Sequence, residues 1–187
     1  MEPLTELPVD GKQKTIRIEE NGIAIEFCLL DSSNQPATVF NKGENFKFHL
    51  SLTNNCKPDS VMYIVSEFLH NPYLFLVYTN SGDSIGKPIK GVACEEISDG
   101  INQIELGEEW IMEIPWTETR TYSFYYEPDE IRFLQCEYTG LNMQPLDTGI
   151  YYTELTQQFC LGRYLPDPQQ ELKCTSMLDL RINFQVK

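Results

Sequence analysis

The sequence has few of the side chains that catalysis requires. It contains only two histidines, His49 and His70, whereas a Ser-His-Asp or Cys-His site needs an imidazole beside an exposed nucleophile. His49 falls on the polar face of a regular strand pattern, where a solvated side chain is the simpler interpretation. The sequence has no His-Glu-x-x-His or Walker segment and no Asp-x-Asp-x-Asp-Gly calcium loop. We therefore expect no enzyme, no cofactor and no metal site, with a loose calcium site at Asp129 and Glu130 or at Asp167 as the alternative.

Basic residues and long apolar runs are also scarce. Fourteen lysines and arginines stand against 28 aspartates and glutamates, which gives a formal net charge of −14. Such a charge repels phosphate backbones and anionic lipids, so nucleic acid is not an expected partner. No run approaches the roughly 18 apolar residues that span a bilayer, and the first residues lack the pattern of a signal peptide. We expect a soluble monomer that is not inserted in a membrane, and a lipid anchor upstream of Met1 stays open.

The chain has six cysteines, which is too few for a disulfide scaffold. None of them forms a Cys-x-x-Cys pair, which argues against a zinc ribbon or a thioredoxin-like centre. Only one pairing stands out, because Cys160 and Cys174 flank a proline-rich connection and could join the arms of a hairpin. The alternative is that all six are buried thiols in a reducing compartment.

The sequence is rich instead in segments typical of β-strands. Tyr and Phe occur ten times each, and aromatic residues favour strands over helices. Apolar residues alternate with polar ones in the segments 23–29, 46–52, 110–116 and 178–186, as in strands with one buried face. The segments 61–65 and 73–78 are apolar on both faces, which is typical of central strands. A long strand over 150–159 pairs with 178–186 in a predicted closing hairpin.

These segments predict one all-β domain. We expect a two-sheet antiparallel sandwich of immunoglobulin-like topology over residues 13–187, preceded by a flexible leader over residues 1–12. One short helix is predicted over residues 128–135, because Pro128 and the acidic residues after it suit the first turn of a helix.

A motif ahead of the predicted closing hairpin supports the fold. Asp147, Gly149 and Tyr151 form an Asp-x-Gly-x-Tyr segment that resembles the tyrosine corner of immunoglobulin-type sandwiches, in which the tyrosine hydroxyl bonds back to the backbone. Antibody-type domains place a cysteine two positions after this tyrosine. Here that position is Thr153, so their inter-sheet disulfide is not expected.

A wider resemblance covers residues 40–155. The pattern is similar to small sandwich domains named after intracellular proteinase inhibitors and to Ig-like envelope lipoproteins of gut Bacteroidales. It is carried by strand and turn residues: Phe46, Phe48, Leu50, Leu52 and Asn54, then Ser81-Gly82, Leu106 to Trp110, Trp116, and Thr148 to Tyr151. The resemblance implies an Ig-like sandwich and a place outside the cytoplasm, and no reactive-site loop is carried over.

The functional expectation is a non-catalytic domain that binds a protein or a glycan at the cell envelope, in the periplasm or at the cell surface. Exposed aromatic residues are common in binding surfaces, and Tyr125-Tyr126 and Tyr151-Tyr152 each place one member outside the core. The alternative function is an inhibitor-like module that blocks a protease with the loop 71–86 or 115–120. The alternative location is the cytoplasm.

Overall fold

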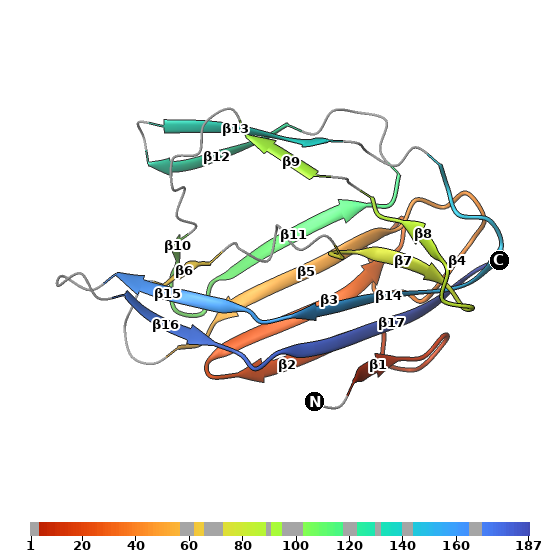
Figure 1. The fold of residues 1–187 in the computed structure, drawn as a ribbon, viewed down its shortest axis with the longest axis horizontal. Coiled ribbons are helices and arrows are strands. Elements are labelled where there is room, and N and C mark those ends of the chain that lie inside the picture. Colours follow the sequence, from red (N-terminus) through yellow and green to blue (C-terminus); the bar gives the residue numbers. More distant parts are fainter. Residues whose placement is uncertain are drawn as a thin grey trace.

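The computed structural model describes most of the chain. It covers residues 4–56, 62–65, 73–88, 91–94, 103–117, 123–129, 132–139, 144–164 and 170–187, with only the backbone described for 91–94, 123–129, 132–139, 164 and 170. Every regular element in these ranges is a β-strand, and they contain no helix. The all-β prediction is therefore confirmed (Figure 1).

The closing hairpin is the centre of a six-stranded sheet. In this sheet β14 (Gly149–Gln157) lies between β17 (Leu178–Val186) and β7 (Leu76–Thr79), and β8 (Ser84–Gly86) follows β7. Two short strands, β1 (Thr5–Leu7) and β4 (Val39–Phe40), run parallel to β17, and the other pairs are antiparallel. The segment 1–12, which the sequence predicts to be a leader, thus contains a strand whose Leu7 is buried.

A second sheet faces the first across the core. It consists of β2 (Thr15–Glu20), β3 (Ile23–Leu30), β5 (Lys47–Asn54) and β11 (Glu109–Pro115), all antiparallel. Phe46 beside β5 and Phe184 of β17 place their ring centroids 5.2 Å apart, and Phe48 and Phe75 are 4.8 Å apart. Each fully buried ring of this kind contributes roughly 1.5–3 kcal/mol, so the aromatic cluster holds the two sheets face to face.

The long hairpin continues from the first sheet into another one. Beyond Gln158 and Phe159 the chain resumes as β15 (Cys160–Tyr164), which pairs with β16 (Gln170–Cys174). On its other side β15 pairs with β6 (Met62–Ile64), which pairs in turn with β10 (Gln103–Ile104). The strands of one hairpin therefore belong to two sheets. They pass from one sheet to the other at a bend, which is formed by residues 158–159 in one arm and 175–177 in the other.

The predicted helix over residues 128–135 is wrong. A three-stranded sheet of β9 (Gly91–Cys94), β13 (Arg132–Thr139) and β12 (Ser123–Asp129) occupies this part of the sequence, and Asp129 is the register partner of Arg132. Pro128 lies where the register of β12 shifts, and β12 pairs only with β13 in the described part of the sheet. Proline is compatible with an irregular edge strand, so the helix-start signal at Pro128 was outweighed by strand-forming residues on both sides.

Candidate functional site

The Asp-x-Gly-x-Tyr segment forms a local structural unit. The Tyr151 hydroxyl donates a hydrogen bond of 2.9 Å to the carbonyl oxygen of Asp147. A Cβ atom at Gly149 would lie 3.1 Å from that hydroxyl, so glycine leaves room for the ring. Tyr151 is buried and stacks on Phe184 with ring centroids 5.7 Å apart. Burial is the main cause that raises the pKa of Tyr151, and these contacts give the residue a role in the fold.

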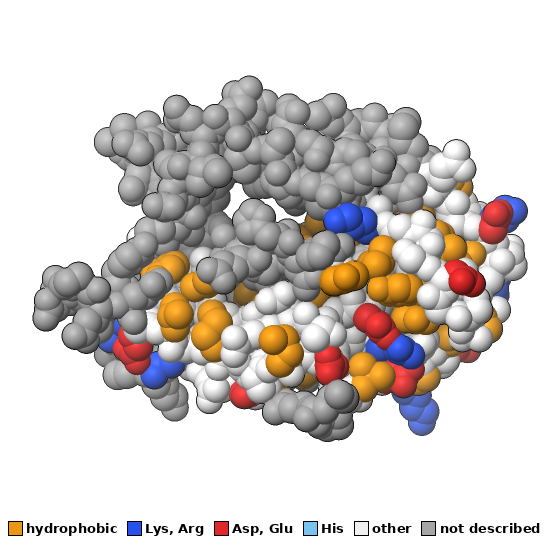
Figure 2. All heavy atoms as spheres, in the orientation of Figure 1, with side chains coloured by type: hydrophobic (Ala, Val, Ile, Leu, Met, Phe, Trp, Pro, Cys, Tyr) orange, Lys and Arg blue, Asp and Glu red, His pale blue; other side chains and the backbone are white. Residues whose placement is uncertain are grey.

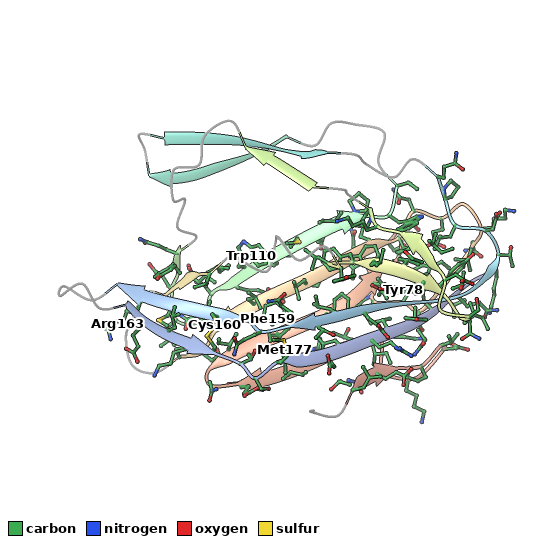
Figure 3. All side chains as sticks on the ribbon, in the orientation of Figure 1. Tyr78, Trp110, Phe159, Cys160, Arg163 and Met177 are labelled. Carbon is green, nitrogen blue, oxygen red and sulfur yellow. A yellow bond between two sulfur atoms is a disulfide. The ribbon has the colours of Figure 1, made fainter. Side chains whose placement is uncertain are left out.

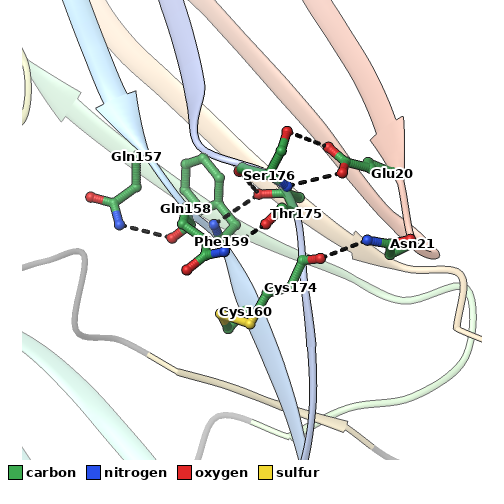
Figure 4. The surroundings of a disulfide bond; sticks show 9 residues. All are labelled: Glu20, Asn21, Gln157, Gln158, Phe159, Cys160, Cys174, Thr175 and Ser176. Carbon is green, nitrogen blue, oxygen red and sulfur yellow. Dashed lines mark hydrogen bonds between the residues drawn. A yellow bond between two sulfur atoms is a disulfide. The ribbon is translucent and has the colours of Figure 1, made fainter. Parts of the chain in front are cut away.

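Cys160 and Cys174 are joined by a disulfide immediately beyond the bend of the hairpin. They are register partners of β15 and β16, with Cα atoms 4.1 Å apart. Asn21 at the β2–β3 turn donates a 2.8 Å hydrogen bond to the Cys174 carbonyl oxygen, and the Ser176 amide and hydroxyl both donate to the Glu20 carboxylate at 2.9 Å (Figure 4). The disulfide therefore fixes the two arms to each other beside the bend, and the hydrogen bonds fix the bend to the β2–β3 turn of the facing sheet. Disulfides are typical of oxidising compartments outside the cytoplasm.

A shallow groove of about 530 Å³ lies beside this disulfide. It contains one thiol and one basic side chain, and it is lined by Asn21, Gly22, Asn55, Cys56, Leu172, Lys173 and Cys174. The Cys56 sulfur contacts the carbonyl oxygens of Asn21 and Gly22 at 3.6 and 3.5 Å, and burial is the main cause that raises its pKa. The described residues that line the groove include no imidazole or carboxylate, and its one amine, Lys173, forms an ion pair with Glu171 that raises the lysine pKa. These side chains therefore offer no base at neutral pH.

His49 lies in the one described row of side chains that resembles a catalytic triad. On the outer face of the second sheet, Cys28 of β3 is the register partner of His49 of β5, and Nδ1 of His49 lies 3.1 Å from Oε1 of Glu113 on β11. Burial alone would raise the pKa of Glu113, but hydrogen bonds from His49 and Lys47 outweigh it and lower that pKa. Cys28 is only 1% exposed, and burial raises its pKa to about 12. A thiol that stays protonated and covered is a poor nucleophile.

The two predicted tyrosine pairs have different outcomes. The side chains of Tyr125 and Tyr126 lie outside the described part of the structure. In the pair on β14, Tyr151 points into the core, and Tyr152 lies half-buried on the outer face of the six-stranded sheet. Around Tyr152 on this outer face, the structure brings together side chains that the sequence analysis did not connect.

Three side chains on this outer face form a stack that we call the tyrosine ladder: Tyr78, Tyr152 and Arg181. Tyr152 is the register partner of Tyr78 on β7, and their rings stack with centroids 5.0 Å apart and an interplanar angle of 14°. The Arg181 guanidinium on β17 lies 4.3 Å from the centroid of the Tyr152 ring and forms an ion pair with Glu154. The ladder thus runs across the three neighbouring strands β7, β14 and β17. Figure 3 labels its first member, Tyr78.

The ladder is part of a larger apolar surface. Tyr73 is 64% exposed and Ile150 is 46% exposed, and Ile150 shares the outer face of β14 with Tyr152. Tyr73 lies close enough to the ladder that it is one of the groups raising the pKa of Tyr78, after burial, Glu154 and Tyr152. Figure 2 shows hydrophobic side chains gathered over β7 and β14, with charged ones beside them over β17. We call this area, Tyr73, Ile150 and the ladder, the ladder surface.

The segments considered as inhibitory loops are partly described. In the first, residues 79–83 form a tight turn in which the Thr79 amide donates to the Asp83 carbonyl oxygen at 2.9 Å and the Ser81 hydroxyl donates to the Asp83 carboxylate at 2.7 Å. In the second, Trp116 is buried and the Thr117 amide donates to the Asn45 side chain at 2.9 Å. Residues 71–72 and 118–120 lie outside the described ranges.

The remaining sequence-based candidates lie outside the described side chains. His70, Glu130 and Asp167 lie outside the described residues, and Asp129 is described by its backbone only. Among the described side chains, no group of three or more His, Cys, Asp or Glu is arranged to hold a metal ion. The described ranges also contain no helix of the length and hydropathy needed to cross a bilayer.

Comparison of the chain with protein-family models, with curated proteins and with solved structures finds no match. The functional inference therefore depends on the chain's own surface.

Proposed function

We propose that the chain is a non-catalytic domain of immunoglobulin-like type that binds a protein partner outside the cytoplasm through the ladder surface. The single observation that carries this proposal is the Tyr78, Tyr152 and Arg181 stack on the outer face of the six-stranded sheet. Tyrosine and arginine are the residue types enriched at the energetic centres of protein interfaces. Stacking fixes their rotamers before binding, which lowers the entropy cost of association.

The ladder favours a protein over a glycan. A sugar that binds by stacking needs a free ring face, but Arg181 covers the Tyr152 ring at 4.3 Å and Tyr78 stacks against it at 5.0 Å. At Tyr152 the ladder therefore offers a ring edge and a hydroxyl, with the partly exposed Arg181 guanidinium beside them, which suit polar and apolar groups of a protein. Tyr73, at 64% exposure, is the ladder-surface tyrosine most accessible to a sugar, and its contribution is part of the test.

The immunoglobulin-like topology is supported by two features. Two sheets face each other across an aromatic cluster, and Tyr151 makes the backbone hydrogen bond expected of a tyrosine corner. The resemblance to Ig-like envelope lipoproteins points in the same direction.

The location outside the cytoplasm is supported by the Cys160–Cys174 disulfide. The non-catalytic character is supported by the row of Cys28, His49 and Glu113, because the buried thiol has a pKa of about 12. We keep the expectation that the domain acts as a monomer and uses no cofactor or metal.

Photo-crosslinking tests the proposed surface. A benzophenone amino acid replaces Tyr73 in one variant and, as the matched control, the 50% exposed Ile111 on the outer face of the second sheet. Both proteins are irradiated with cell-envelope material from the source organism. We expect a protein adduct of discrete mass from position 73 and none from position 111. Adding Tyr152→Ala should reduce this adduct about tenfold or more, whereas Thr156→Ala on the same face should leave it unchanged.

Equal labelling from positions 73 and 111, or labelling that is insensitive to Tyr152→Ala, would contradict the proposal. A glycan array that shows binding abolished by Tyr73→Ala would make a glycan the ligand. Incubation with a panel of proteases tests the inhibitor alternative, which requires inhibition at micromolar protein concentration.

A further inference from the structure

The sheet formed by β9, β13 and β12 places two cysteines opposite each other. In the antiparallel pairing of β9 with β13, Cys94 is the register partner of Cys136. Of the six cysteines in the chain, Cys160 and Cys174 form a disulfide, and Cys28 and Cys56 are buried thiols. The two remaining cysteines are therefore the two that the backbone register brings together.

Register partners in an antiparallel ladder have the spacing that a disulfide requires. Their Cα atoms are about 4.5 or 5.5 Å apart, disulfides join Cα atoms about 4.4 to 6.8 Å apart, and both residues belong to the same face of the sheet. Cys160 and Cys174 show that this chain uses such positions, because they are register partners and are bonded. We propose that Cys94 and Cys136 form a second cross-strand disulfide.

The proposed bond requires an oxidant. The two thiols lose two protons and two electrons as the S–S bond forms, and the disulfide of a thiol–disulfide oxidoreductase or of oxidised glutathione accepts them and becomes two thiols. The reaction proceeds through a mixed disulfide between one cysteine and the oxidant, which the second thiol then displaces. The compartment that oxidises Cys160 and Cys174 supplies the same oxidant.

The second disulfide would have two consequences for the molecule. It would join β9 to β13 covalently, and it would leave only Cys28 and Cys56 as thiols. Six cysteines minus four in disulfides gives two thiols, whereas the Cys160–Cys174 bond alone would leave four. Because the proposal rests on backbone register and not on the ladder surface, it stands or fails independently of the binding function.

Peptide mapping under non-reducing conditions tests the bond directly. The full chain is secreted into an oxidising compartment, unfolded without reductant, alkylated, and digested with trypsin and a glutamate-specific protease. Cleavage after Lys90, Glu95, Arg132 and Glu137 releases Cys94 in residues 91–95 and Cys136 in residues 133–137. We expect these two peptides to be linked and the intact mass to show two alkylated cysteines. The linked peptides 155–163 and 174–181, which contain Cys160 and Cys174, report in the same sample that oxidation has occurred.

The linked peptides that contain Cys160 and Cys174 serve as the internal link that shows oxidation. In a sample where this link is present, three outcomes would overturn the proposal: four alkylated cysteines, free peptides 91–95 and 133–137, or Cys94 linked to a cysteine other than Cys136. If the internal link is missing, the folded protein is first oxidised in a glutathione redox buffer, and the same outcomes then apply. Cys94→Ser should raise the number of alkylated cysteines from two to three. The control Cys28→Ser should lower it to one without changing either linked pair.

Discussion

The two halves of the long hairpin are stabilised in different ways. In the half formed by β14 and β17, which we call the packed half, the strands pair over nine residues and bury their inner face against the aromatic cluster of the facing sheet. In the other half, β15 and β16 pair over five residues and belong to another sheet, and the Cys160–Cys174 disulfide joins the two strands. The comparison indicates that core packing stabilises the hairpin where its strands face the second sheet. Where the strands continue beyond that sheet–sheet interface, a disulfide supplies additional stability.

The largest effect should come from the packed half. Phe184 is fully buried and contacts the rings of Phe40, Phe46 and Tyr151. Phe184→Ala should lower the free energy of unfolding by about 3–5 kcal/mol, because it leaves a cavity in the cluster. Urea denaturation measures this change. The control Gln185→Ala, on the outer face of the same strand, should change stability by less than about 0.5 kcal/mol, and Phe184→Leu gives a smaller loss if the alanine variant does not fold.

Removal of the disulfide should have the next largest effect. The bond closes a loop with a sequence separation of 14, and a disulfide of this loop size contributes about 3 kcal/mol. In Cys160→Ser/Cys174→Ser we expect that loss in urea denaturation, together with faster hydrogen exchange in β15 and β16 than in β14 and β17. An equal increase in exchange along the whole hairpin would show that the two halves unfold as one unit and would remove the distinction between them.

The tyrosine corner should contribute less. Tyr151→Phe removes the hydroxyl that donates to the Asp147 carbonyl oxygen, and the loss should be about 1 kcal/mol. The variant also makes a pH prediction. The pKa of Tyr151 is raised in the folded protein, so the hydroxyl's contribution is fully present below pH about 10 and is lost as the pH rises through the folded-state value.

Urea denaturation of both proteins at neutral pH and at alkaline pH measures this difference. The wild type should lose stability more steeply than Tyr151→Phe above pH about 10. Tyr78, whose pKa is also raised, is present in both proteins and cancels from the comparison. Parallel pH profiles would show that the Tyr151 hydroxyl is not linked to folding.

Local sequence patterns predicted those features that depend on residues close together in the chain. The alternation of 178–186 identified the buried and outer residues of β17. The spacing of Cys160 and Cys174 across a short connection singled out the pair that the structure joins, but it left free thiols as the alternative. The predicted helix at Pro128 failed because helix-start residues are a weak local signal when both flanks pair as strands.

Non-local pairing explains what the sequence could not show. Alternation places Tyr152 and Arg181 on an outer face, but only strand order brings Tyr78 beside Tyr152, because β7 and β14 are far apart in the sequence. The same applies to the passage of the hairpin from one sheet to another, which depends on the pairing of β15 with β6. Strand register between distant segments is set by the packing of the whole core.

The smallest effect should come from the outer face of the packed half, where the ladder adds little to stability. The contact of Arg181 with the Tyr152 ring is partly exposed, with 29% of the arginine side chain accessible, and a cation–π contact of this kind contributes about 0.5–1 kcal/mol. A double-mutant cycle of Tyr152→Ala and Arg181→Ala should give a coupling free energy in that range. The matched cycle of Tyr152→Ala with Asp179→Ala should give a coupling near zero, because Asp179 bonds to Thr156 on the same face. If the ladder cycle also gave no coupling, Tyr152 would not be held in place before binding, and the entropy advantage proposed for the ladder surface would be lost.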